Sequence, residues 1–195
     1  MYNRLYGFLC QNDFFNPDQF GFRTNHSTDH ALMQLFDRVS SALADRKHVI
    51  GIFMDLSKAF DTLDHKILLY KLRHYGVRGT ALTWFENYLL CRKQFVSFDS
   101  VSSNTLPVTC GVPQGSILGP LLFLIYINDI SNASSMLQYI LFADDTNVFY
   151  SHADLNHLVA TLNNELPKLS TWFKSNILAL NLSKTNFIHF KCKKS

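Results

Sequence analysis

The sequence predicts a mixed α+β fold, and two patterns carry this prediction. Residues 49–56 form a nearly continuous apolar run with β-branched members, which is typical of a central strand buried on both faces of its sheet. In residues 27–43 and 155–173 the apolar positions instead recur at helical spacing, so each segment has one face to bury. No internal repeat links these segments, and we therefore expect helices and strands in irregular order.

The opening residues, 1–20, are rich in aromatic and polar side chains and are only weakly periodic, with a turn predicted at Asn16-Pro17-Asp18. Residues 63–75 are predicted to form a helix. Asp64 is a suitable N-cap for this helix, because its carboxylate can accept hydrogen bonds from the first backbone N–H groups. Gly76 is a suitable stop, because glycine tolerates the left-handed backbone that ends many helices.

The middle of the chain continues with a second helix predicted over 80–90. Residues 95–109 contain strand-like stretches, until Gly111-Val112-Pro113 interrupts the pattern. Residues 117–127 are predicted to form a buried helix, and residues 137–150 two strands around a turn.

The last third of the chain holds the amphipathic helix over 155–173. Pro167 lies inside it, and because proline removes a backbone donor we expect a kink there or a division into two helices. Residues 180–190 are predicted to begin as a turn and to end as a strand.

Composition limits the class of protein. The chain has 195 residues, of which 47% are hydrophobic and 17% charged, which suits one globular domain and excludes wholesale disorder. The net charge of +3 permits a nucleic-acid partner without requiring one. The longest apolar run is too short for a membrane span, and the first ten residues do not resemble a signal peptide. We therefore expect a soluble intracellular protein without a membrane partner.

Four cysteines are widely spaced, at positions 10, 91, 110 and 192, and none forms a C-x-x-C pair. This spacing argues against a zinc ribbon or a thioredoxin-like motif and favours reduced thiols.

Three carboxylates interrupt apolar segments in which a charge is costly. Asp55 closes the run 50–54, and Asp144 and Asp145 lie inside the strand-like segment 139–150. A carboxylate at the end of an apolar strand loses hydration unless something compensates for the loss. Two adjacent carboxylates also repel each other, and a cation is the natural way to keep both ionised.

Each of these carboxylates also has a plain structural interpretation. Asp55 could cap the turn that follows it, and Asp144-Asp145 could be the polar tip of a β-hairpin. Taken together, three carboxylates on two strands could instead form one oxygen-ligand cluster, which suits Mg²⁺. A pair of such ions can hold the attacking and leaving oxygens of a phosphoryl transfer. Spacing alone does not establish that the two segments meet.

Five segments, taken in order, form a recognisable set: Gln19–Arg23 with His26–Thr28, Phe53–Asp61, Gly111–Pro120, Phe142–Asp145 and Leu180–Thr185. The set resembles the reverse transcriptase domain of non-long-terminal-repeat retrotransposons, close to the jockey and chicken-repeat branches. The first segment resembles a fingers segment, and the other four resemble motifs A, B, C and D of that family. A pair of aspartates alone is common, but all five segments in this order over about residues 19–190 are specific.

The resemblance implies a right-hand polymerase palm, a small antiparallel sheet backed by helices, with partial fingers and without a thumb. Residues 1–195 would be a single reverse transcriptase domain fragment. Partial fingers would occupy about 1–48, and the palm with a fingers-like insertion about 49–195. The first fingers motif would lie before Met1, and the primer grip and thumb would follow Ser195.

The resemblance also implies roles for individual residues. Asp55, Asp144, Asp145 and Lys184 would be catalytic, with Lys184 as the motif D lysine that protonates the pyrophosphate leaving group. The metal ligands would be Asp55, Asp144, Asp145 and the Leu56 carbonyl. The backbone amides of Leu56 to Ala59, with Ser57 and Lys58 between them, would hold the triphosphate, and the ring of Phe60 would be the steric gate against a ribose 2′-OH. Gln114 and Gly115 would lie beside the nascent base pair and template, and Arg23 from the fingers would contact triphosphate or template.

The activity implied is RNA-directed DNA synthesis. The 3′-OH of a DNA primer would attack the α-phosphate of a deoxynucleoside triphosphate, with two Mg²⁺ ions, or Mn²⁺ in their place, and an RNA template. The implied location is the nucleus and cytoplasm. Two other functions stay open: a catalytically inactive nucleic-acid-binding remnant of the same fold, and a polymerase that copies RNA into RNA, against which Phe60 argues.

Several of these residues also have simpler interpretations. Lys184 could be a solvated turn residue, and Asp61 and Asp64 are expected to be cap and turn residues. His65 is expected to mark the start of a helix. His26 and His30 are four positions apart, but a zinc site would need two more ligands.

Overall fold

The computed structural model describes residues 1–192. The chain divides into two compact units, each made of two stretches. One consists of Phe15–Ala59 together with the described residues from Ile127 onward, and the other of Met1–Phe14 and Phe60–Tyr126. The sequence predicts a different boundary, near residue 48, between partial fingers and palm. That boundary concerns function and stays a prediction.

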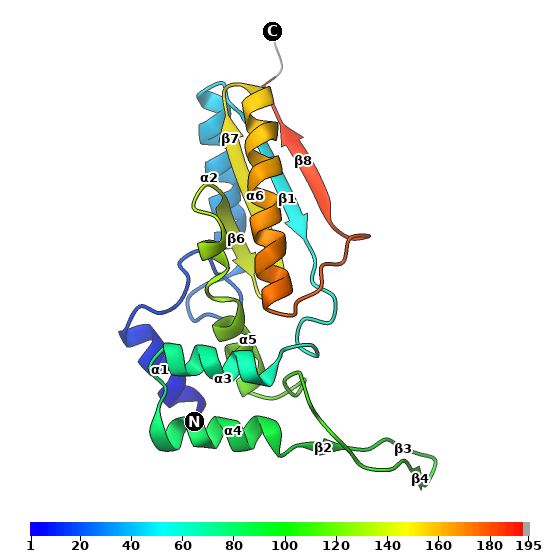
Figure 1. Cartoon of the computed structure of the whole chain (residues 1–195). Helices are drawn as coiled ribbons and strands as arrows, with labels where there is room; N and C mark the ends of the chain where they lie inside the picture. The colour runs from blue at the N-terminus through cyan, green and yellow to red at the C-terminus, as the bar shows by residue number, and fades with distance from the viewer. Residues whose placement is uncertain (193–195) are drawn as a thin grey trace. The chain divides into compact units, whose positions relative to one another are not determined.

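The first unit is built around a four-stranded antiparallel sheet with the strand order β6-β7-β1-β8. Its strands are β1 (His48–Met54), β6 (Gln138–Phe142), β7 (Asp145–His152) and β8 (Asn186–Phe190), and its helices are α2 (Thr28–Ala44), α6 (Leu155–Ser175) and the short 3₁₀ helix η1 (Ile130–Ala133). Figure 1 shows α6 in front of the sheet and α2 behind it.

The packing of β7 explains why one helix lies on each face. Phe149 packs with Ile140 against Ala31 and Leu35 of α2. Its neighbour Val148 points to the opposite face, because successive side chains of a strand alternate, and it is also buried. Since α6 contacts β7, α6 covers that second face.

The prediction that residues 49–56 are buried on both faces is correct only in part. β1 is an internal strand, and Val49, Gly51 and Met54 are buried, but Ile50 and Ile52 are half-buried. The reason is that α6 packs mainly against β7, while β8 on the other side of β1 is an exposed edge strand.

The predicted division of the amphipathic helix at Pro167 is wrong. α6 is one continuous helix with Pro167 inside it. Leu158, Leu162, Leu169 and Phe173 are buried on the same helix face before and after the proline, whereas Pro167 itself is exposed. These buried apolar side chains therefore stabilise one continuous helix across the proline. The backbone carbonyl that lacks an N–H donor because of Pro167 lies on the solvent side.

The second unit contains α1 (Tyr2–Gln11), α3 (His65–His74), α4 (Gly79–Leu90) and most of α5 (Leu118–Ile127). Asp64 caps α3, with its side chain accepting from the Ile67 N–H at 2.9 Å, and Gly76 has the positive φ of a helix stop. Both features were predicted. Helices α4 and α5 also agree with the sequence, whereas α1 was not predicted.

A narrow β-arm extends from the end of α4 in Figure 1. It consists of the short strands β2 (Lys93–Gln94), β3 (Ser97–Phe98), β4 (Val101–Ser102) and β5 (Leu106–Pro107). These pair as β2 with β5 and β3 with β4, and all their residues are exposed. The strand-like stretches predicted over 95–109 thus form an arm and not part of the main sheet. Within the described residues, no helix combines the length and apolar character needed to cross a membrane.

Candidate active site

The three carboxylates come together through the pairing of β1 with β7. Met54 pairs with Thr146, so the next residues along the ladder are Asp55 on one strand and Asp145 on the other. Asp144 lies in the tight turn between β6 and β7, directly before Asp145. The hairpin predicted from the sequence is confirmed, and the ends of its strands lie beside the end of β1.

The electrostatic surroundings of Asp145 include the two other carboxylates. Burial raises the pKa of Asp145 above its usual value, the charges of Asp144 and Asp55 raise it further, and Lys184 lowers it. Such repulsion is what a divalent cation would relieve. In residues 1–192 no three His, Cys, Asp or Glu side chains already stand in metal-binding geometry.

Asp55 is held by the loop that precedes β8. The Asn181 side chain donates from Nδ2 to Asp55 Oδ2 at 3.1 Å, and Lys184 Nζ lies 3.5 Å from the same oxygen. The backbones of the two segments are also paired. The Asn181 N–H donates to the Asp55 carbonyl at 2.9 Å, and Leu56 forms a β-bridge with Leu180. The segments that resemble motifs A and D are therefore neighbours in space.

The turn that carries Asp144 is fixed by a buried glutamine. Gln19 Oε1 accepts from the Ala143 N–H at 3.0 Å, and its Nε2 donates to the Ala143 carbonyl at 3.3 Å. Ala143 has a φ of +56°, a left-handed conformation that is unfavourable for alanine. Gly21 also packs here: a Cβ at this position would lie 2.1 Å from the Ala143 nitrogen, so only glycine fits.

Two other predicted nucleotide-binding residues of this unit, Ser57 and Arg23, already have partners. The Ser57 N–H donates to the Ala179 carbonyl at 2.8 Å, and Lys58 has a φ of +50°. Arg23 donates from one terminal nitrogen to the carbonyls of Asn16 and Gln19, and its guanidinium lies over the Phe15 ring. In this structure Arg23 therefore braces the segment that leads to Gln19, and a role in nucleotide binding stays a prediction.

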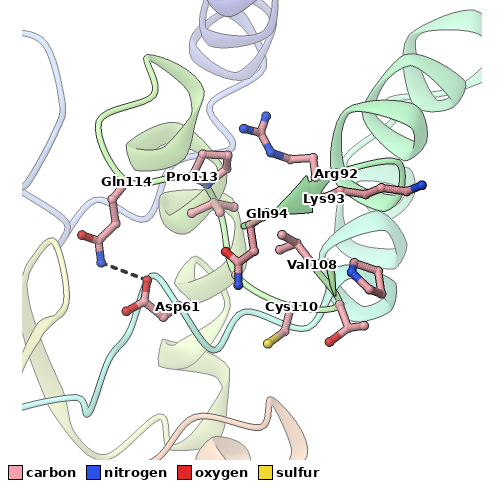
Figure 2. A pocket seen from close by; sticks show the side chains of 12 residues that line it. Asp61, Arg92, Lys93, Gln94, Val108, Cys110, Pro113 and Gln114 are labelled. Atoms are coloured by element: carbon pink, nitrogen blue, oxygen red, sulfur yellow. Dashed lines mark hydrogen bonds between the residues drawn. The ribbon is translucent and has the colours of Figure 1, made fainter. Parts of the chain in front are cut away.

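Phe60, Gln114 and Gly115 belong to the second unit, where they line one cavity of about 480 Å³. The Phe60 ring stacks on Phe123 of α5, with 4.7 Å between ring centroids and 30° between ring planes. Gln114 donates to the Asp61 carboxylate at 2.9 Å, a bond visible in Figure 2. Asp61, expected from the sequence to be a turn residue, therefore holds a predicted nucleotide-binding side chain.

The loop that resembles motif B is anchored to the end of motif A and to the residues just after it. Its Gly111 N–H donates to the Leu63 carbonyl at 2.8 Å, and the Val112 N–H donates to the Phe60 carbonyl at 2.9 Å. His65 is buried, and its Nε2 is bonded to the Gly111 carbonyl at 2.7 Å. A Cβ on Gly111 would meet the Asp61 carbonyl oxygen at 2.6 Å.

Sequence reasoning missed three positioning residues: Gln19, His65 and Asn181. Gln19 lies within the segment that resembles the fingers, Asn181 within motif D and His65 at a predicted helix start, and none of these places indicates a positioning role. All three act by hydrogen bonds to backbone or carboxylate groups distant in sequence, and no local pattern predicts such bonds.

The fold is that of a right-hand polymerase. A solved structure of telomerase from Candida tropicalis, in complex with a TWJ fragment of telomeric RNA, matches 99% of this chain and 33% of its own, with a TM-score of 0.73 and 13% identity. The apo telomerase of the same species, truncated from its C-terminal domain, matches 97% of this chain and 39% of its own, with a TM-score of 0.67 and 11% identity. At these identities the likeness concerns the fold alone.

The family follows from the sequence comparisons. The model of the family described as reverse transcriptase (RNA-dependent DNA polymerase) matches residues 1–194, and the chain belongs to this family. Two of the relatives from Drosophila melanogaster illustrate the match. The probable RNA-directed DNA polymerase from transposon BS is 31% identical over 94% of this chain and 21% of its own length. The RNA-directed DNA polymerase from mobile element jockey is 28% identical over 88% of this chain and 19% of its own.

The resemblance to retrotransposon reverse transcriptases is thus confirmed. The chain spans about a fifth of the length of these relatives. The family generally uses divalent metal ions.

Proposed function

We propose that this chain carries the catalytic carboxylates of an RNA-directed DNA polymerase, which extends a DNA primer along an RNA template. The observation that supports this most is the end of the β1–β7 ladder. There Asp55 and Asp145 are the next pair along two neighbouring strands, and Asp144 is adjacent to Asp145. After burial, the charges of Asp144 and Asp55 are what raise the pKa of Asp145.

The donor set fits hard divalent cations. Its ligands would be the carboxylates of Asp55, Asp144 and Asp145 with the Leu56 carbonyl, all of them oxygen, which Mg²⁺ prefers and Mn²⁺ also accepts. Two bound ions would stabilise the negative charge that develops on the attacking and leaving oxygens. Burial raises the pKa of Asp145, and the charges of Asp144 and Asp55 raise it further. A divalent cation beside these carboxylates would favour their charged forms and so offset both effects, which supports this fit.

The other residues would bind and orient the reactants. Lys184 Nζ, an exposed ammonium beside Asp55, would donate a proton to the pyrophosphate leaving group as the primer 3′-oxygen bonds to the α-phosphorus. Phe60, braced by Phe123, would exclude a ribose 2′-OH. Gln114 and Gly115 would contact the nascent base pair.

The proposed triphosphate contacts are the backbone amides of Ser57, Lys58 and Ala59, together with Arg23. Contact through the Ser57 N–H requires its bond to the Ala179 carbonyl to open. The RNA template, DNA primer and deoxynucleoside triphosphates as partners, and a location in the nucleus and cytoplasm, belong to the same proposal.

Primer extension on a poly(rA)–oligo(dT) hybrid with Mg²⁺ and dTTP tests the proposal. Asp144→Asn removes one proposed ligand and should lower synthesis by at least about 100-fold, the usual cost of losing a group that stabilises transition-state charge. Asp154→Asn is the matched control, because it removes an exposed aspartate at the start of α6 and asparagine caps helices equally well.

Equal synthesis by the Asp144→Asn variant and the unmodified chain would refute the assignment of the carboxylates. A catalytically inactive nucleic-acid-binding remnant of the same fold is the second candidate. That candidate predicts binding of the hybrid by both proteins and synthesis by neither.

A further inference from the structure

Asn181 contacts Asp55 at two points, through backbone and side chain. Its N–H donates to the Asp55 carbonyl at 2.9 Å, and its Nδ2 donates to Asp55 Oδ2 at 3.1 Å. Both residues are half-buried, so water competes less for these bonds than it would at an exposed site. Two bonds to one residue fix both the position of its backbone and the direction of its carboxylate.

The orientation of the Asn181 amide is itself fixed from the other side. Ser183 Oγ donates to Asn181 Oδ1 at 2.7 Å. Because an ionised carboxylate can only accept, the NH₂ end of the amide must face Asp55 and the oxygen end must face Ser183. The N–H groups of Lys184 and Thr185 both donate to the Asn181 carbonyl, at 3.1 and 3.0 Å, which closes the loop around this residue.

Only one oxygen of the Asp55 carboxylate is engaged. Oδ2 takes both the Asn181 amide and the Lys184 ammonium, whereas Oδ1 has no hydrogen bond or ion pair to any residue from 1 to 192. A carboxylate that ligates a metal is commonly held through such a bond from a group that does not itself touch the ion. A neutral amide suits this task, since it fixes the carboxylate without neutralising its charge.

We propose that Asn181 is a positioning residue that holds Asp55 by Oδ2, so that Oδ1 is directed to a divalent cation. The inference rests on the proposed function, because it requires Asp55 to be a metal ligand. Lys184 is the weaker of the two contacts to Oδ2: its nitrogen is 3.5 Å away and its side chain is largely exposed. A cation binding beside Asp55 would therefore displace Lys184 and leave the Asn181 bond in place.

Direct Mn²⁺ binding tests this without relying on catalysis. The 195-residue chain would be titrated with Mn²⁺ in the absence of nucleotide, with free Mn²⁺ followed by its electron paramagnetic resonance signal. Asn181→Ala should raise the Kd for Mn²⁺ about tenfold or more, the usual effect of losing a group that orients a ligand. Ser183→Ala should raise the Kd by a smaller factor, because the amide then loses only the contact that orients it.

Asn186→Ala is the matched control. Asn186 is exposed in the same region and donates to the Lys184 carbonyl at 2.9 Å, with no bond to Asp55, so its loss should leave the Kd unchanged. Ser183 is also exposed, and its variant therefore carries the test if Asn181→Ala fails to fold. Circular dichroism establishes which variants are folded.

Asp55→Asn separates the two hypotheses. If it weakens Mn²⁺ binding while the folded Asn181 and Ser183 variants bind as the unmodified chain does, the role of Asn181 is refuted and the metal site stands. If the unmodified chain binds no Mn²⁺, or binds it independently of Asp55, both the metal site and the role of Asn181 are overturned.

Discussion

Single residues decide the shape of the catalytic end of the sheet, and several of them do so without touching substrate. Gln19 is buried, and both ends of its amide bond the backbone of Ala143, a residue 124 positions away. A buried amide costs free energy unless its donors and acceptors are paired. Gln19 meets that condition by holding the left-handed residue directly before Asp144.

Phe60 carries a residue-scale prediction about sugar selection. Its ring is stacked on Phe123, so it should resist displacement by a ribose 2′-OH. Phe60→Ala removes the ring and should reduce the preference for dTTP over UTP about 10- to 100-fold, within the range that one steric contact contributes to discrimination. The measurement is kcat/KM for each nucleotide on the poly(rA)–oligo(dT) hybrid.

Phe60→Tyr is the control for this prediction, because it keeps the ring and the stack and should keep the preference for dTTP. Equal use of dTTP and UTP by the unmodified chain would contradict the steric-gate role and favour a polymerase that copies RNA into RNA.

The candidate site shows which residue roles a sequence reveals. Asp55, Asp144 and Asp145 could be found because a charge at the end of an apolar strand is anomalous in its local context. Gln19 and Asn181 could not, because an amide in a loop is ordinary and its partner lies on another element. His65 does begin α3, as its position predicted, but its burial and its bond to Gly111 follow from tertiary packing and have no local signal.

Among the elements, periodicity and capping predicted most of the helices and strands, and local signals were weakest where the predictions failed. In α1 only Leu5 and Leu9 are buried, Gly7 lies in the middle, and no side chain caps the start. These ten residues therefore carry no local signal strong enough to predict a helix. The β-arm had the right strand character, but strand character does not indicate that it projects from the main body of its unit.

Helix α6 carries the element-scale prediction. Pro167 leaves one backbone carbonyl without its helical donor and costs roughly 3 kcal/mol in a helix interior. Because Pro167 is exposed and its neighbours already form a continuous helix, Pro167→Ala should need no repacking. We expect it to raise the free energy of unfolding by about 1–3 kcal/mol, measured by urea denaturation.

Asn164→Ala is the control for α6. It is an exposed position one turn earlier, where alanine should add only roughly 0.5 kcal/mol of helix propensity. If both substitutions raised stability equally, Pro167 would be no obstacle to the helix.

For the chain as a whole, histidines link stability to pH at the end of the sheet far from the carboxylates. His189 on β8 lies beside His48 on β1, with 3.2 Å between His189 Nε2 and His48 Nδ1. Burial lowers the pKa of His189, and the neighbouring charges of His48 and Lys191 lower it further. Protonation of this ring therefore opposes the pairing of the edge strand with β1.

The direction of the pH effect follows from where protons bind. A histidine in the unfolded chain takes up a proton near pH 6.5, whereas His189 in the folded chain does so only at lower pH. Between these values the unfolded state holds more protons, so the stability that is fully present above about pH 6.5 is lost as the pH falls through the folded pKa.

His189→Gln should flatten this loss of stability, because glutamine can still bond His48 but does not titrate. Thermal unfolding at about pH 7.5 and 5.5 measures the effect, with the exposed His30→Gln variant as control. If the two variants lost stability equally between these pH values, His189 would not be the group that links the fold to pH.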